Sequence, residues 1–149
     1  MTEDRYAICV GNFYVDLAEK LVNGAKSEFA KDGVTDIEVF EVPGAFELPL
    51  AAHYCANSGR FAGVACLGAV IRGETDHYDF VCNEAARGIQ NVQLETGVPC
   101  GFGVLTVDNM EQALARADVG GKRDSGANAA RAVLRMNEMR AELGVPLNV

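Results

Sequence analysis

The stretch GVACLGAVIRGETDHYDFVCNEAARG, residues 63–88, decides the fold. Its opening run, 63–71, is apolar throughout, which is typical of a parallel strand covered on both faces of a sheet. A short polar turn follows, and from about Asp76 apolar side chains recur at helical spacing. A buried strand that leads directly into a helix indicates one β–α unit of a parallel sheet.

The same alternation of strand and helix patterns extends along the rest of the chain. We expect strands at 5–11, 36–42, 63–71 and 100–107. We expect helices from Leu17 to a stop at Gly33, through 47–59, from about Asp76, from Asp108 to about Ala117, and across 129–143. Right-handed crossovers place helices on both faces of such a sheet. The sequence therefore predicts an α/β fold, a three-layer α/β/α sandwich with a four-stranded parallel sheet, flavodoxin-like, in a single domain over residues 1–149.

The charge and composition exclude several functions. The chain of 149 residues is about half apolar and has a formal net charge of −8, so we expect no broad basic surface and no nucleic-acid binding. No apolar run reaches the length of a membrane span, and we expect no membrane insertion. The N-terminus has acidic residues and no cleavage-site pattern, which favours a cytoplasmic location.

The five cysteines do not form a recognisable site. They stand at 9, 55, 66, 82 and 100, in an odd number and without a CxxC pair. Most lie in apolar segments, so we expect buried free thiols rather than disulfides or a zinc site. The two histidines are far apart in the chain, and we expect no metal site.

Parallel sheets bind ligands beyond the carboxyl ends of their strands. That rule selects four loops in this chain, which are GNFY at 11–14, VPGAFELP at 42–49, IRGETDH at 71–77 and TVDN at 106–109. We therefore expect the binding and catalytic residues in these four loops, on one edge of the sheet.

The loop IRGETDH has the features of an anion site. Gly73 permits a tight turn, Thr75 or Asp76 can cap the helix, and the first helical amides favour a phosphate. Arg72 could add a charge or face a structural partner. His77 lies in the first helical turn, where the positive helix end favours a neutral imidazole that can accept a proton. The alternative is an ordinary exposed histidine on a capped helix.

The loop VPGAFELP points to recognition of hydroxyl groups. Pro49 must fall in the first helical turn, where its missing N–H costs nothing. The amides of Ala45, Phe46 and Glu47 are then free to meet ligand oxygens. The Glu47 carboxylate is an acceptor suited to a sugar or polyol, although a glutamate at a helix start is also favoured by the helix dipole alone.

Three further residues give divided signals. Phe13 follows the first strand and could stack on a planar heterocycle or cover the edge of the core. Phe102 alternates with Cys100 and Val104, which is the pattern of a core residue. Arg116 ends the short helix near the fourth strand, where a cation is favourable without any ligand.

Several common motifs are incomplete or missing. The segment GFGVLT, 101–106, lacks the third glycine of a dinucleotide fingerprint, and there is no Walker A loop or nucleophile elbow. A flavodoxin-like regulatory or nucleotide-binding domain needs a phosphate loop after the first strand, which VGNFYVD does not supply. Asp108 with Glu111 resembles a capping box that starts the short helix.

In this order, the motifs closely resemble the lumazine synthase family. The matching text spans nearly the whole chain and reads GNFY, VPGAFELPLAA, GAVIRGETDHYDFVCNEAARGI, GVPCGFGVLTVDNMEQALARA and SGANAARAVLRM. The resemblance implies that 5-amino-6-(D-ribitylamino)uracil condenses with 3,4-dihydroxy-2-butanone 4-phosphate to 6,7-dimethyl-8-ribityllumazine, phosphate and water, the penultimate step of riboflavin biosynthesis. It also implies a transferase that needs no metal or organic cofactor.

The resemblance assigns roles to residues at matching positions. They are Phe13, Ala45, Phe46, Glu47, Ala69, Val70, Ile71, Gly73, Glu74, Thr75, His77, Phe102 and Arg116. It implies that Phe13 stacks on the pyrimidine, that 45–47 hold the ribityl chain, and that 69–71 offer backbone to the pyrimidine. It implies that 73–75 cradle the phosphate and that His77 transfers protons. Phe102 and Arg116 would come from a neighbouring subunit, with Arg116 on the phosphate.

The chain departs from the family pattern before its last helix. Ser125 stands where the family usually has a lysine, and Lys122 or Arg123 could substitute, while Ser125 itself could be only an N-cap. Asp118 replaces a usual glycine. This departure motivates one alternative, a catalytically weak paralogue that binds flavin or lumazine or serves as a scaffold.

The resemblance also implies an active site shared between subunits of a homo-oligomer. The family forms pentamers, and in some members twelve pentamers form an icosahedral shell. The loop from Arg116 to Gly126 is about one residue longer than the shell-forming pattern, and the N-terminus offers little strand to a neighbour. We therefore expect a pentamer rather than a 60-subunit shell.

Overall fold

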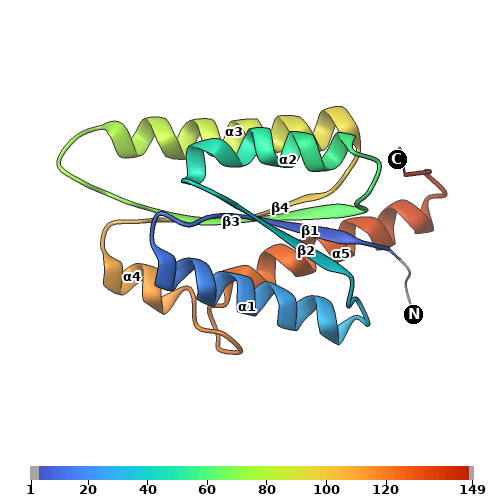
Figure 1. The fold of residues 1–149 in the computed structure, drawn as a ribbon, viewed down its shortest axis with the longest axis horizontal. Coiled ribbons are helices and arrows are strands. Elements are labelled where there is room, and N and C mark those ends of the chain that lie inside the picture. The colour runs from blue at the N-terminus through green and yellow to red at the C-terminus, as the bar shows by residue number, and fades with distance from the viewer. Residues whose placement is uncertain (1–3, 148–149) are drawn as a thin grey trace.

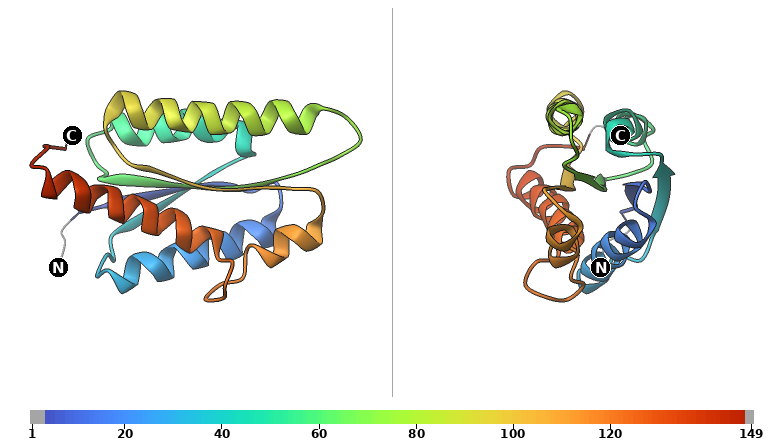
Figure 2. Two further views of the ribbon diagram at one scale, coloured as in Figure 1. Left: turned by 180° about the vertical axis from the view of Figure 1, so that it is seen from behind. Right: turned by 90° about the vertical axis from the view of Figure 1, so that its left-hand side faces the viewer.

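The structure, a computed structural model, describes residues 4–147. Within this range one parallel sheet of four strands lies between two layers of helices, as Figure 1 and Figure 2 show. The strands are β1 (Tyr6–Gly11), β2 (Ile37–Val42), β3 (Gly63–Ile71) and β4 (Cys100–Val107), in the order β2-β1-β3-β4. This arrangement confirms the predicted three-layer α/β/α sandwich.

Two helices cover one face of the sheet, and three lie on the other side. The helices are α1 (Val15–Lys31), α2 (Leu48–Asn57), α3 (His77–Thr96), α4 (Met110–Ala115) and α5 (Ser125–Glu142), and a 3₁₀ turn, η1 (Ala45–Glu47), precedes α2. Helices α2 and α3 form the upper layer of Figure 1, and α1, α5 and the short α4 lie below the sheet. No helix within 4–147 is long and apolar enough to cross a membrane.

The strand β3 is central, as its apolar run predicted. It pairs with β1 on one side and β4 on the other, and residues 63–68 are buried. Its side chains alternate between two cores: Ala65 and Leu67 face the α1 and α5 side, and Val64 and Cys66 face the α2 and α3 side. A strand covered on both faces buries every side chain, which explains why no polar residue interrupts it.

The start of α4 differs from the prediction. The cap is Asn109, whose Oδ1 accepts a hydrogen bond from the Gln112 N–H at 2.9 Å. Asp108 is not the cap, because its carboxylate binds the Arg72 guanidinium at 3.1 Å. The capping box with Glu111 is therefore wrong, and the reciprocal bond comes from Gln112, whose Oε1 accepts from the Asp108 N–H at 2.7 Å.

The start of α5 is also capped by a different residue. The Asp124 side chain accepts from the Ala127 N–H at 3.0 Å, so Asp124 is the N-cap and Ser125 is the first helical residue. The possibility that Ser125 serves as the cap is excluded. An aspartate at an N-cap satisfies a free helical amide and complements the helix dipole.

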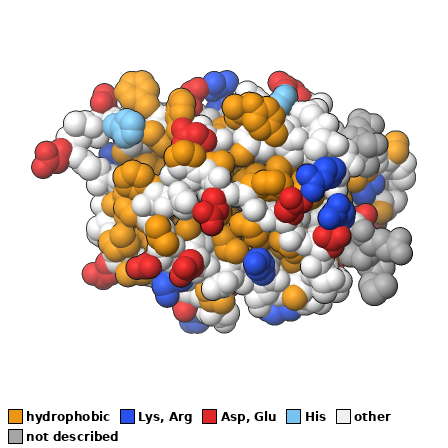
Figure 3. All heavy atoms as spheres, viewed as in Figure 1, with side chains coloured by type: hydrophobic (Ala, Val, Ile, Leu, Met, Phe, Trp, Pro, Cys, Tyr) orange, Lys and Arg blue, Asp and Glu red, His pale blue; other side chains and the backbone are white. Residues whose placement is uncertain are grey.

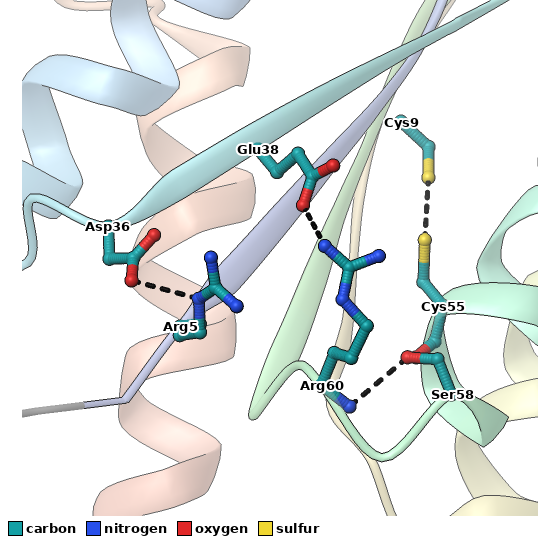
Figure 4. Close-up of polar contacts among 7 residues, drawn as sticks. All are labelled: Arg5, Cys9, Asp36, Glu38, Cys55, Ser58 and Arg60. Atoms are coloured by element: carbon teal, nitrogen blue, oxygen red, sulfur yellow. Dashed lines mark hydrogen bonds and ion pairs between the residues drawn. The ribbon is translucent and has the colours of Figure 1, made fainter.

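The five cysteines are free thiols, and four of them are buried. Cys82 is only partly buried. The Sγ atoms of Cys9 and Cys55 lie 3.7 Å apart between β1 and α2, as Figure 4 shows. Burial raises the pKa of Cys66 well above its ordinary value and that of Cys100 to about 12. These findings confirm the expectation of structural thiols.

The amino ends of the strands are held by ion pairs between neighbouring segments. Arg5 binds Asp36 at 2.8 Å, and Arg60 binds Glu38, as Figure 4 shows. Each pair joins the segment before one strand to β2 or to the residue that precedes it. The polar groups shown at this edge of the sheet therefore have partners from the chain itself.

Candidate active site

A cleft of about 520 Å³ lies at the carboxyl ends of β1, β2 and β3. Its lining comes from the loop after β1, the η1 turn, the end of β3 and the first turns of α3. The lining residues are Phe13, Tyr14, Gly44, Ala45, Phe46, Glu47, Ala69, Val70, Ile71, His77, Phe80 and Val81. The cleft therefore lies where the parallel-sheet rule placed the ligand.

A second hollow of similar volume lies along α1 and the edge strand β2. Its lining includes Asn12, Glu19, Lys26 and Glu41 together with small aliphatic side chains. It contains no histidine and no phenylalanine, and Asn12 already donates to Glu41 at 3.1 Å. We therefore take the first cleft as the candidate active site.

The cleft exposes three phenylalanines. Phe13, Phe46 and Phe80 are 74, 58 and 65% exposed. Phe13 packs edge-on against Tyr14, with ring centroids 4.9 Å apart, so one face of its ring is not buried in the core. Figure 3 shows hydrophobic side chains reaching the surface at the end of the molecule that carries the loops after the strands. Exposed aromatic rings around one hollow mark a binding surface rather than a core edge.

Close backbone contact shapes the floor of this cleft. A side chain at Gly11 would meet the Gly44 carbonyl carbon at 2.9 Å, so the end of β1 and the start of η1 lie directly against each other. Pro49 falls in the first turn of α2, as predicted. Glu47 lines the cleft, and within 4–147 its carboxylate forms no hydrogen bond or ion pair. This carboxylate is available to accept hydrogen bonds from a ligand.

Asp76 occupies the N-cap position of α3, but the side-chain hydrogen bond to the start of the helix comes from Thr75. Its Oγ1 accepts from the His77 N–H at 3.3 Å, whereas Asp76 makes no side-chain cap bond. The segment 73–75 is exposed, and a side chain at Gly73 would meet nothing within 4 Å. The loop leaves backbone open toward solvent, which is the environment that a phosphate cradle requires.

The Arg72 guanidinium contacts side chains of the chain itself. Its Nε donates to Asp108 at 3.1 Å, its Nη1 lies 3.8 Å from Asp79, and its guanidinium lies 4.3 Å from the Tyr78 ring centroid. These contacts tie the loop after β3 to the loop after β4. Of the two roles left open for Arg72, the structural one is therefore observed.

His77 is the first residue of α3, and it lines the cleft. It is exposed, and its imidazole forms no hydrogen bond within the part of the chain that the structure describes. The same cleft brings this imidazole together with Phe13, Glu47 and the end of β3. An imidazole, an unpaired carboxylate and exposed aromatic rings therefore share one hollow.

Five residues of the predicted set do not line this cleft: Gly73, Glu74 and Thr75, which stand in the loop just before His77, and the two more distant residues Phe102 and Arg116. Phe102 is 44% exposed on β4, so the expectation that alternation makes it a core residue is wrong. The reason is that β4 is an edge strand, and Phe102 is not covered there as Cys100 and Val104 are. Arg116 follows α4, and its Nη1 donates to the Gln112 carbonyl at 3.0 Å. Neither residue lines the cleft of its own subunit.

Sequence reasoning missed four residues of the cleft lining: Tyr14, Gly44, Phe80 and Val81. Phe80 and Val81 stand three and four residues after His77, so they share its face of α3. That spacing could have identified them, but an apolar residue on a helix is usually counted as core. Within 4–147 no group of three or more His, Cys, Asp or Glu residues could hold a metal ion.

The fold and the cleft define a class, the single-sheet parallel α/β proteins that bind a small molecule beyond the carboxyl ends of their strands. Within that class, the chain belongs to the 6,7-dimethyl-8-ribityllumazine synthase family. The sequence model of this family matches residues 3–141.

Three curated relatives have the same name, 6,7-dimethyl-8-ribityllumazine synthase. The protein of Ruthia magnifica is 43% identical over 91% of this chain and 85% of its own length. The protein of Thermococcus gammatolerans is 44% identical over 93% of this chain and 89% of its own. The protein of Synechococcus elongatus is 41% identical over 93% and 79%. The family resemblance predicted from the sequence is confirmed.

Proposed function

We propose that this protein catalyses the condensation of 5-amino-6-(D-ribitylamino)uracil with 3,4-dihydroxy-2-butanone 4-phosphate. The products are 6,7-dimethyl-8-ribityllumazine, phosphate and water, and the enzyme is a transferase of riboflavin biosynthesis. Relatives of this name match nearly the whole chain, and an open cleft joins His77, Glu47 and Phe13. The match over residues 3–141 is the observation that carries this function.

The pyrimidine substrate fits the apolar side of the cleft. Phe13 has an exposed ring for stacking on a heterocycle, and the backbone of 69–71 meets the edge of the pyrimidine. The ribityl hydroxyls bind at Ala45, Phe46 and Glu47, where the unpaired carboxylate is the strongest acceptor. Stacking and hydroxyl bonds together place the amino group of this substrate for attack on the ketone.

The phosphorylated ketone binds nearer the start of α3. Gly73, Glu74 and Thr75 supply open backbone for the phosphate, and His77 lies at the next position. His77 moves protons as the imine forms with loss of one water, phosphate leaves, and the ring closes with loss of a second water. General acid–base catalysis of this kind contributes on the order of 10²–10⁴-fold. Arg116 of a neighbouring subunit neutralises the phosphate, and Phe102 of that neighbour completes the cleft wall.

The exposed apolar residues support a homo-oligomer. Leu50, Tyr54 and Leu94 on the α2 and α3 layer are each more than half exposed, and Phe102 is exposed on the edge strand. A surface of this kind is stable in water when another subunit covers it. We favour a pentamer over an icosahedral shell, and native mass measurement of the purified protein tests it. A particle of shell mass would overturn the pentamer.

The remaining expectations from the sequence stay predictions. We keep residues 1–149 as one domain, since both cores pack on one sheet. We keep the cytoplasmic location as a prediction as well. Lys122 lines a small hollow with Gly24 and Asp124 and, like Arg116, does not line the cleft of its own subunit. That Lys122 or Arg123 takes the place of the usual lysine stays a prediction.

A direct assay tests the proposed activity. The purified protein is mixed with both substrates, and formation of the lumazine is followed by its fluorescence. Ser125→Lys, which restores the usual residue, is compared with the natural chain to measure what the serine costs. Turnover by the natural chain is expected, and a flat trace with active relatives as positive controls would overturn the proposal.

A further inference from the structure

The segment from Arg116 to Ser125, here called the Arg116 strap, is a loop whose two ends are hydrogen-bonded to each other. The Ser125 N–H donates to the Arg116 carbonyl at 3.0 Å, and the Asp118 N–H donates to the Arg123 carbonyl at 3.1 Å. An antiparallel bridge pairs Ala117 with Asp124. The two ends of the strap are therefore held side by side, and the backbone of Arg116 is fixed from its far end.

Asp124 anchors this strap with a buried carboxylate. It is 8% exposed, and only Asn137 is also a buried polar side chain between residues 4 and 147. Its Oδ2 accepts from the Gly120 N–H at 2.8 Å, and its Oδ1 accepts from the Ala127 N–H at 3.0 Å. One carboxylate thus binds both the tip of the strap and the start of α5. A buried carboxylate is costly without such bonds, so both oxygens are committed to this geometry.

The helix α1 packs closely against the same carboxylate at Gly24. A side chain at Gly24 would lie 2.2 Å from Asp124 Oδ1, which is closer than two such atoms can approach. Gly24 is inside α1, where glycine is unfavourable by up to about 1 kcal/mol relative to alanine. This cost is consistent with a requirement for close contact between α1 and the Asp124 carboxylate.

The strap holds the backbone of Arg116, and α4 holds its guanidinium. Arg116 lies between α4 and the strap, its carbonyl accepts from Ser125, and its Nη1 is held by the Gln112 carbonyl at 3.0 Å. We propose that Asp124 is a positioning residue for Arg116 and so sets the affinity for the phosphorylated ketone. This inference rests on the proposed function, in which Arg116 meets the phosphate of a neighbouring site.

Two variants weaken the anchor without touching any substrate group. Asp124→Asn replaces one accepting oxygen by an NH₂ that cannot accept from a backbone N–H. Gly24→Ala places a methyl group against the carboxylate and keeps both partners. Each is expected to raise the KM for the phosphorylated ketone about tenfold, because displacement of a charged group by a fraction of an ångström weakens its pairing. The KM for the pyrimidine should stay within about twofold.

A matched control disturbs the α5 packing elsewhere. A side chain at Gly63 would lie 2.3 Å from Val133 Cγ1, so Gly63→Ala strains the contact between β3 and α5 away from the strap. This variant should lower the melting temperature while leaving the ratio of the two KM values unchanged. If it changes that ratio as much as Gly24→Ala does, Asp124 acts only through stability and the inference is overturned.

The double variant Arg116→Ala/Asp124→Asn separates positioning from a general effect. If Asp124 acts through Arg116, the double variant should have the same KM for the phosphorylated ketone as Arg116→Ala alone. Additive increases would overturn the inference and leave the role of Arg116 intact. If Arg116→Ala alone leaves this KM unchanged, the proposed role of Arg116 fails, and the inference fails with it. If Asp124→Asn does not fold, Gly24→Ala alone and combined with Arg116→Ala gives the same comparison.

Discussion

The two ends of the sheet differ in how their polar and aromatic groups are used. At the amino ends, Arg5 binds Asp36 and Arg60 binds Glu38. At the carboxyl ends, Glu47 and His77 have no side-chain partner within the described chain, and Phe13 is 74% exposed. Both ends face solvent, and although Arg72 pairs with Asp108 at the carboxyl end, the Glu47 and His77 side chains in the cleft there stay unpaired. The difference supports the proposal that a ligand and a neighbouring subunit complete the carboxyl end.

Energetics explains why the carboxyl end can remain open. Water satisfies an exposed carboxylate or imidazole, so leaving Glu47 and His77 unpaired costs little stability. Exposing Phe13, Phe46 and Phe80 does cost, because each ring keeps apolar surface in water. That cost is recovered when a heterocycle or another subunit covers the rings. The carboxyl end of the sheet therefore adds less to the stability of the isolated chain, because its exposed groups are positioned to bind.

The largest expected effect follows from removing the imidazole at the carboxyl end. We expect His77→Ala to lower kcat for lumazine formation by about 10²–10⁴-fold and no more, so that turnover stays measurable. Activity persists because positioning of the two substrates does not depend on this side chain. His53→Ala, which changes the only other histidine, is the control and should retain full activity. Equal losses in both variants would contradict the role of His77.

The next effect concerns the unpaired carboxylate of Glu47. We expect Glu47→Gln to raise the KM for the pyrimidine by roughly 10-fold, because hydrogen bonds from hydroxyls to a charged acceptor are worth about 1.5–3 kcal/mol. The KM for the phosphorylated ketone should change much less. Glu19→Gln removes an exposed carboxylate from α1, outside the cleft, and should change neither constant. A rise in both KM values for Glu47→Gln would place the carboxylate elsewhere in the mechanism.

The local sequence pattern was sufficient to predict the fold, because a strand that is buried on both faces of the sheet has a continuous apolar sequence. The strand at 63–71 could therefore be predicted to the residue. Caps were less predictable: Asp108 and Asn109 are both good cap residues, and Arg72 from another loop decides between them by binding Asp108. Competition of this kind depends on tertiary contacts, which a local sequence pattern does not contain.

The same distinction applies to the site. Loops that follow parallel strands meet at one edge, so Phe13, Glu47 and His77 could be brought together from topology alone. Phe80 was missed although it stands three residues after His77, because an apolar residue in a helix has the same pattern whether it faces the core or a cleft. Arg116 has no partner in the cleft of its own subunit, and its assignment came from the family resemblance.

The next prediction concerns a buried thiol in the core between the two ends of the sheet, and how it changes stability at alkaline pH. Burial raises the pKa of Cys100 to about 12, whereas an unfolded cysteine ionises near ~8.5. Between these values the folded protein binds more protons than the unfolded chain, so the free energy of unfolding falls as pH rises. One such thiol contributes a slope of about 1.4 kcal/mol per pH unit, and its contribution is fully present below ~8.5.

Cys100→Ser isolates this thiol, since serine does not titrate in that range and retains a group able to donate to the Val98 carbonyl. Urea unfolding at fixed protein concentration, repeated from about pH 8 to pH 10.5, gives the two slopes. We expect a shallower decline for the variant. Parallel curves would show that Cys100 ionises in the folded protein as readily as in the unfolded chain.

The smallest effect is expected at the amino end. The side chains of Arg60 and Glu38 are 48 and 40% exposed, so their ion pair is screened by solvent and adds at most about 1 kcal/mol. The Arg60 guanidinium also lies 4.9 Å from the Phe61 ring centroid. We therefore expect Arg60→Ala to lower the free energy of unfolding by about 0.5–1 kcal/mol and to leave both KM values and kcat unchanged.

Salt provides the second half of that test. In about 1 M NaCl the Debye length falls to roughly 3 Å, so the stability difference between the natural chain and Arg60→Ala should shrink. Arg5→Ala, which removes the other amino-end pair, should behave in the same way. If kcat for either variant fell nearly as far as for His77→Ala, the two ends would not have the separate roles in stability and in catalysis that we assign to them. Such a fall would mean that the amino end contributes to catalysis through the sheet, rather than only holding the strands together.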